Sequence, residues 1–146
     1  MLTFAREYDI IFIEKERGIK MKVYLASPLF TEFEKEMVKR RANLLRSMGA
    51  EVYVPMEHQI KDAYELPNYA WARAVFEEDV KAIRECDVVV CLYYGLYSDS
   101  GTAWECGFAY GIGKRVELIN MCGKEASLMM VNCAFNSEDF KDKNQT

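Results

Sequence analysis

Four short apolar runs alternate with three longer amphipathic segments along the chain. Each run is rich in valine, leucine or tyrosine, a pattern that predicts a buried strand. The predicted strands are residues 23–26, 51–54, 87–92 and 116–119. Pro28 and Pro55 follow the first two strands and end them, because proline cannot continue a hydrogen-bonded ladder.

The three segments between the strands carry apolar residues near helical spacing and predict helices at 31–48, 69–84 and 102–112. The first helix has clear ends, since Thr31 stands as an N-cap with Glu34 three residues later, and Gly49 follows as terminator. The order β-α-β-α-β-α-β predicts a parallel sheet with helices on both faces. We therefore expect a single α/β domain with a flavodoxin-like or Rossmann-like sheet.

The two ends of the chain depart from this alternation. We expect residues 1–20 to form an N-terminal extension, with Met21 as an alternative start, and residues 21–135 to form the domain. Residues 136–146 are polar and are expected to form a frayed tail. The stretch 57–68 is expected to be a long polar loop, of the kind that often carries function.

Composition narrows the classes of partner. The net charge is −4, the isoelectric point is near 5.2, and Lys and Arg are scattered, so no nucleic-acid polymer is expected as a partner. The five cysteines form no CxxC pair, which argues against disulfides and zinc and indicates a reducing cytoplasm. The apolar stretch 10–13 is too short for a signal or membrane segment, so no membrane partner is expected.

Two carboxylates follow the third predicted strand, Asp99 in a loop and Glu105 in the expected first turn of a helix. Ligands of parallel α/β sheets bind outside the carboxyl ends of the strands, which is where this segment lies. The helix dipole would favour the charged form of Glu105 there. Two carboxylates at one cleft suit retaining glycosidic chemistry, in which one attacks the anomeric carbon and an acid protonates the leaving group. Taken alone, acidic capping of a helix is the simpler explanation of this pair.

The run DSGTAWECGFAY at 99–110, followed by GKRV at 113–116, is similar to the signature of the nucleoside 2-deoxyribosyltransferases. Two other stretches resemble the same family, VYLASPLF at 23–30 and WARAVFEED at 71–79. The resemblance extends over residues 21–130. It implies an α/β fold with a pocket at the carboxyl edge of the sheet.

The resemblance implies a role for each matched residue. Glu105 would be the nucleophile, Asp99 would handle the base, and Tyr24 would orient Glu105. Phe30 would contact the base, and Asp79 would lie near the substrate. Without the resemblance, Tyr24 and Phe30 would be ordinary core aromatics and Asp79 a solvated charge on a helix.

Five further residues complete the expected substrate site. Trp71 opens the matched helical segment, and Gly101 lets the turn into the next helix approach a ligand. Ser27 stands where the family commonly has glycine, and its hydroxyl suits a contact with a phosphate. The family supplies an Asn-x-Met to the neighbouring subunit's pocket. Here Met129 matches the methionine, and Asn132 is the candidate to replace the asparagine.

The resemblance implies a transferase that moves 2-deoxyribose from a 2′-deoxynucleoside to a free base through a covalent Glu105 intermediate. The expected partners are a small deoxynucleoside, a nucleobase and further copies of the chain in a homo-oligomer. We expect no metal and no organic cofactor, because the sequence holds no ligand cluster. Two alternatives stay open, a 2′-deoxynucleoside 5′-phosphate N-hydrolase and a non-catalytic nucleotide-sensing module. His58, the only histidine, is expected to be a solvated loop residue.

Overall fold

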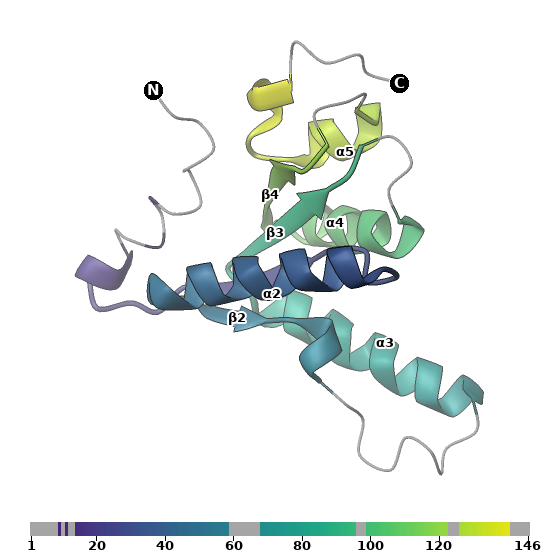
Figure 1. Ribbon diagram of the computed structural model, residues 1–146. Helices are drawn as coiled ribbons and strands as arrows, with labels where there is room; N and C mark the ends of the chain where they lie inside the picture. The colour runs from purple at the N-terminus through teal and green to yellow at the C-terminus, as the bar shows by residue number, and fades with distance from the viewer. Residues whose placement is uncertain are drawn as a thin grey trace.

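The computed structural model describes residues 9, 11, 14–58, 68–95, 99–122 and 126–140. These residues form one four-stranded sheet in the order β2-β1-β3-β4, and every neighbouring pair is parallel. The strands are β1 (Lys22–Ala26), β2 (Glu51–Tyr53), β3 (Val88–Tyr93) and β4 (Arg115–Asn120). The predicted parallel α/β fold is confirmed (Figure 1).

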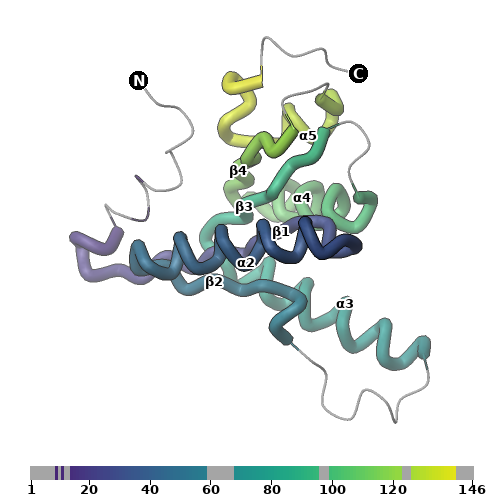
Figure 2. The backbone as a smooth tube through the Cα atoms, in the orientation of Figure 1, coloured from purple at the N-terminus to yellow at the C-terminus, as the bar shows by residue number. Residues whose placement is uncertain are grey.

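Helices cover both faces of the sheet, as the path of the backbone in Figure 2 shows. The helices are α2 (Glu32–Ser47), α3 (Asn68–Glu85), α4 (Ser100–Gly111) and α5 (Leu128–Cys133), and the 3-10 helices are η2 (Pro55–Glu57) and η4 (Ser137–Phe140). The chain steps from β1 to β2 on one side and then to β3 on the other, so right-handed crossovers place α2 and α3 on opposite faces. No helix in the described part of the chain is long and apolar enough to cross a membrane.

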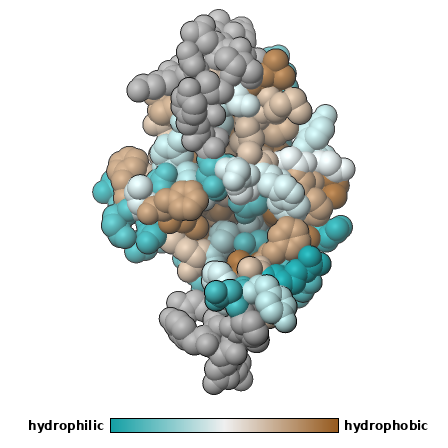
Figure 3. Space-filling view, turned by 90° about the vertical axis from the view of Figure 1, so that its right-hand side faces the viewer, coloured by the Kyte–Doolittle hydropathy of each residue, from teal (hydrophilic) through white to brown (hydrophobic). Residues whose placement is uncertain are grey.

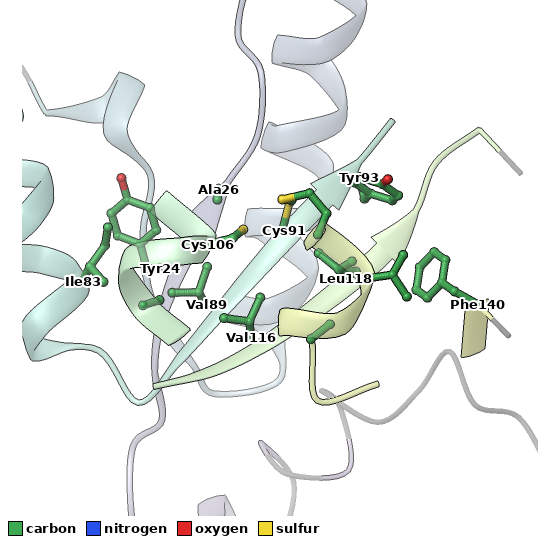
Figure 4. Close-up of a cluster of buried hydrophobic side chains, with 14 of the residues drawn as sticks. Tyr24, Ala26, Ile83, Val89, Cys91, Tyr93, Cys106, Val116, Leu118 and Phe140 are labelled. Carbon is green, nitrogen blue, oxygen red and sulfur yellow. The ribbon is translucent and has the colours of Figure 1, made fainter. Parts of the chain in front are cut away.

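Alternate side chains of each strand enter two separate cores. In β1, Val23 and Leu25 pack in the core beneath α2, whereas Tyr24 and Ala26 pack in the core beneath α3, α4 and α5. Figure 4 shows the second core, in which β-branched and sulfur-containing side chains lie between the sheet and the helices. This alternation aims Tyr24 at the face that carries the candidate carboxylates.

The predicted ends of α2 are confirmed. The Thr31 hydroxyl accepts a hydrogen bond from the backbone N–H of Glu34, and the Glu34 side chain accepts one from the backbone N–H of Thr31. Gly49 follows the helix with φ +100, a conformation that side chains other than glycine rarely adopt. These ends fix where α2 begins and therefore the length of the turn after β1 that lines the candidate site.

Both chain ends are more closely packed than the sequence indicates. Ile11, within the expected N-terminal extension, is 2% exposed and packs in the core beneath α2. The expected frayed tail is wrong for its first five residues, because Asn136 and Phe140 are buried and η4 lies between 137 and 140. Residues 141–146 and most of the expected loop 57–68 lie outside the described residues.

Asn136 holds the C-terminal segment to β4, and we predict that Asn136→Ala destabilises the fold. Its amide oxygen accepts from the N–H of Leu118 at 2.9 Å, and its amide nitrogen donates to the carbonyl of Leu118 at 2.8 Å. The substitution leaves two buried backbone groups unpaired, so the free energy of unfolding should fall by about 2–4 kcal/mol in urea titrations. Asn43→Ala, on the exposed face of α2, is the matched control and should change it by less than about 0.5 kcal/mol. Equal effects of the two substitutions would contradict this role.

Candidate active site

A cavity of about 430 Å³ lies at the carboxyl edge of the sheet, where β1, α3 and α4 meet. Its lining residues are Ser27, Leu29, Phe30, Pro55, Phe76, Asp79, Val80, Asp99, Gly101, Trp104 and Glu105. Figure 3 views the molecule from the side toward which the β3 arrow points in Figure 1, and apolar and hydrophilic side chains interleave on that face. The position agrees with the rule for parallel sheets, because β1 and β3 flank the point where the strand order reverses.

Glu105 lies in this cavity and is held by Tyr24 of strand β1. The Tyr24 hydroxyl, on a side chain that is 0% exposed, donates a hydrogen bond to Oε2 of Glu105. Burial raises the pKa of Glu105 to about 7, and the nearby charges of Asp79 and Asp99 act in the same direction. The hydrogen bond from Tyr24 acts against this rise. Near neutral pH, therefore, both the protonated and the ionised forms of Glu105 are populated.

The expected place of Glu105 in the first helical turn is wrong. Helix α4 begins at Ser100, two residues earlier than the sequence indicates, so Glu105 is its sixth residue and lies in the second turn. The N-terminal N–H groups of a helix act mainly within its first turn, so they do not hold this carboxylate. The expectation that the helix favours its charged form fails as well, because the pKa of Glu105 is raised.

Asp99 takes the position at the N-terminus of α4 as its N-cap. Its Oδ2 accepts hydrogen bonds from the backbone N–H and the hydroxyl of Thr102, both at 2.9 Å, and so caps α4. The same residue lines the cavity. Gly101 lines it too, and a Cβ at this position would come within 3.1 Å of Oδ2 of Asp99. Glycine thus allows the capping carboxylate and the cavity wall to lie close together.

Asp79 enters the cavity from α3, as the matched segment implied. Its Oδ1 accepts a hydrogen bond from the Tyr53 hydroxyl at 3.0 Å. Burial raises the pKa of Asp79, whereas the hydrogen bond from Tyr53 lowers it. Helices α3 and α4 and the loop before α4 therefore bring Asp79, Asp99 and Glu105 to one cavity.

The expected substrate-binding residues divide into two groups. Ser27 and Phe30 line the cavity, and Phe30 is 77% exposed, which leaves its ring free to contact a ligand. Trp71, Met129 and Asn132 do not line it. Met129 is 76% exposed on α5, and the side-chain amide of Asn132 donates to the Leu128 carbonyl at 2.8 Å.

Phe76 and Trp104, which were not among the residues expected at the site, form an aromatic wall of the cavity. The rings of Trp104 and Phe76 lie 5.2 Å apart, and Trp104 also stacks on Phe108 with centroids 5.2 Å apart and planes 6° apart. Two signals were available, since Trp104 directly precedes Glu105 and Phe76 precedes Asp79 by one helical turn. His58 is exposed, as expected, but it also stacks on Tyr53 with ring centroids 4.0 Å apart. Among the described residues, no three His, Cys, Asp or Glu side chains are arranged to hold a metal ion.

The model of the nucleoside 2-deoxyribosyltransferase family matches residues 23–143 of the chain. The chain belongs to this family. The match confirms the resemblance found in the sequence and extends it beyond residue 130 into the C-terminal segment that Asn136 holds to β4. Asp79 on α3 and Glu105 on α4 both lie within the matched residues and line the cavity.

Individual proteins to which the chain is similar are also described as deoxyribosyltransferases. A nucleoside deoxyribosyltransferase of Lactobacillus johnsonii is 33% identical over 93 residues, which cover 58% of this chain and 62% of that protein. One of Lactobacillus leichmannii is 27% identical over 110 residues, covering 68% and 70%. The solved structure of a 2-deoxyribosyltransferase from Bacillus psychrosaccharolyticus has a TM-score of 0.72 at 32% identity and covers 83% of this chain and 90% of that chain. The part of this chain that matches the Lactobacillus johnsonii protein spans 62% of the length of that protein.

The raised pKa of Glu105 predicts how its replacement changes stability with pH. The folded chain holds this proton with a pKa of about 7 against an ordinary 4.5, so ionisation of Glu105 removes stability as the pH rises between these values. Glu105→Gln removes that loss and should gain stability relative to the unsubstituted protein, on the order of 3 kcal/mol between pH 4 and pH 8. Urea unfolding across this range measures the gain. The exposed Glu16→Gln is the control, and a gain for Glu105→Gln that does not vary with pH would contradict the burial argument.

Proposed function

We propose that the chain is a nucleoside 2-deoxyribosyltransferase that uses Glu105 as its nucleophile. The observation that carries the proposal is the partly buried Glu105 carboxyl group, held by Tyr24 and sharing one cavity with Asp79 and Asp99. A pKa near 7 keeps a fraction of Glu105 ionised at neutral pH, while burial leaves the ionised oxygen poorly solvated and therefore reactive. Tyr24 engages Oε2, so we assign the attack to Oε1.

The proposed reaction has two displacements at C1′ of the sugar. Oε1 of Glu105 forms a bond to C1′ while the bond from C1′ to the base nitrogen breaks, and its electron pair leaves with the base. Asp99, with Asp79, hydrogen-bonds or protonates the departing base. A nitrogen of a second base then attacks C1′, gives up its proton to Asp99 or Asp79, and the bond to Glu105 breaks, which regenerates the carboxylate. A deoxyribose favours this route because it lacks the 2′-hydroxyl, which disfavours the oxocarbenium-like transition state.

The lining of the cavity favours a neutral nucleoside over its 5′-phosphate. Among the described residues it contains three carboxylates and neither lysine nor arginine, so a phosphate dianion would be repelled. Ser27 favours the N-hydrolase, because its hydroxyl suits a contact with a phosphate. Ser27 lines the cavity, and its hydroxyl donates a hydrogen bond to the Pro28 carbonyl at 2.9 Å. The presence of all three carboxylates in one cavity argues against a module that only senses nucleotides.

We further propose that the chain acts as a homo-oligomer in which Met129 and Asn132 approach the cavity of a neighbouring copy. Both residues are exposed on α5 and neither lines the cavity of its own chain. An incomplete cavity wall in the single chain supports the same arrangement, because the cavity is open enough to expose 77% of Phe30.

Product analysis distinguishes the candidate activities. Purified protein with 2′-deoxyinosine and free adenine should form deoxyadenosine and hypoxanthine, measured by chromatography. Glu105→Gln should lower kcat by about a thousandfold or more, because the amide cannot form the covalent intermediate. Glu36→Gln, on the opposite face of the sheet, is the matched control. Free base released only from 5′-monophosphates would move the assignment to the N-hydrolase, and binding without base release would move it to the sensor.

Two tryptophans form a matched pair for testing the aromatic wall. Trp104 and Trp71 are 46% and 45% exposed, but only Trp104 lines the cavity. If Trp104 stacks on the base, Trp104→Leu should raise KM about tenfold, since stacking of a base on an aromatic side chain contributes about 1–3 kcal/mol. Steady-state kinetics of both variants measure the difference. An equal or larger effect of Trp71→Leu would contradict the assignment of the base to the Trp104 wall.

A further inference from the structure

Tyr53 occupies the position on β2 that directly faces Tyr24 on β1. The two residues are register partners in the parallel pairing of these strands. Their rings stack with centroids 5.4 Å apart and planes 15° apart. Because register partners point to the same face of a sheet, both hydroxyl groups are directed toward α3 and α4.

Each of these two tyrosines donates its hydroxyl to a different carboxylate of the cavity. Tyr24 donates to Glu105 on α4, and Tyr53 donates to Oδ1 of Asp79 on α3 at 3.0 Å. The hydrogen bond of Tyr53 is therefore the counterpart of the one that orients Glu105. It leaves Oδ2 of Asp79 to accept a hydrogen bond from a donor on the substrate.

His58 fixes the ring of Tyr53 from the other side. The imidazole stacks on Tyr53 with centroids 4.0 Å apart and planes 15° apart, so Tyr53 lies between His58 and Tyr24. The 3-10 turn η2, which follows β2, brings His58 back beside Tyr53. The backbone N–H of His58 donates a hydrogen bond to the Pro55 carbonyl at 3.1 Å. A ring with neighbours on both faces has few orientations open to it, so the direction of its hydroxyl is fixed.

We infer that Tyr53 is a positioning residue that holds Asp79 toward the substrate, and that His58 keeps Tyr53 in the required orientation. This inference rests on the proposed function, in which Asp79 acts on the substrate beside Glu105. It assigns a use to the only histidine of the chain and to a tyrosine outside the motifs of the family resemblance.

The charges around Asp79 give the direction of the effect. Burial raises the pKa of Asp79, and so does Glu78 on the same helix, whereas the Tyr53 hydrogen bond and the charge of His58 lower it. Asp79 in turn raises the pKa of Glu105, across from it on α4. Removing the Tyr53 hydroxyl should therefore move the titration of Asp79 to higher pH.

The first test does not depend on turnover. The side-chain carboxyl carbon of Asp79, assigned with Asp79→Asn, is titrated by carbon-13 NMR in the unsubstituted protein and in Tyr53→Phe. The midpoint should move to higher pH in Tyr53→Phe and stay in place in Tyr110→Phe, a change on the exposed side of α4. An unchanged midpoint in Tyr53→Phe would overturn the inference, even if the protein had no activity at all.

The second test is a double-mutant cycle on kcat/KM for deoxynucleoside cleavage. Tyr53→Phe should lower kcat/KM about tenfold in the unsubstituted protein, the scale of a hydrogen bond to a charged group. In an Asp79→Asn background the same change should cost less than about twofold, because Tyr53 acts through Asp79. Equal losses in both backgrounds would show a merely structural role and overturn the inference.

His58→Ala keeps the inference testable if Tyr53→Phe fails to fold. His58 is exposed, so its truncation leaves both cores intact. The Asp79 midpoint should again move to higher pH, because both the stacking on Tyr53 and the charge of His58 are lost. If the unsubstituted protein releases no base, the proposed function fails, while the NMR titrations still decide on Tyr53.

Discussion

The hydrogen bond from Tyr24 to Glu105 joins the centre of the sheet to the helix that lines the cavity, and the other features of the site depend on it. A carboxyl group placed among apolar side chains would normally stay protonated, because its ionised form loses the water that stabilises it. The Tyr24 hydroxyl offsets part of that cost, and the pKa of Glu105 comes to about 7. Without this hydrogen bond the pKa of Glu105 would rise further, and in a fully solvated site it would fall back toward its ordinary value.

The other two carboxylates of the cavity, Asp79 and Asp99, are held by hydrogen-bond donors different from the one that holds Glu105. Asp99 is tied to the N-terminus of α4 through Thr102, and Asp79 is tied to β2 through Tyr53. Each carboxylate is thus held by a different donor on a different element, which fixes its orientation independently of the others. Three acidic groups in one cavity also give it a negative potential, which is unfavourable for a phosphate group.

The aromatic lining of the cavity is a feature that the structure shows and that the family match does not describe. The family match covers residues 23–143 and shows which family the chain belongs to. The aromatic wall comes from the structure itself: Phe76 and Trp104 present their rings to the cavity beside the carboxylates, and Phe108 stacks on Trp104 from outside the lining. Flat apolar rings next to acceptor oxygens suit a planar, hydrogen-bonding base, which connects the chemistry of the lining to the proposed substrate.

The cavity carboxylates were indicated by the resemblance to the family. The sequence pattern by itself determined the order of strands and helices and the ends of α2. These features depend on local patterns, such as alternating apolar residues in β1 or the capping pair Thr31 and Glu34, which act over a few neighbouring residues. Only the tertiary structure decided the place of Glu105 in the second turn of α4, its raised pKa and the burial of Asn136 against β4. The pairing of Tyr53 with Asp79 likewise joins residues 26 positions apart. Burial and contacts between distant segments arise when the chain packs, so no local pattern in the sequence encodes them.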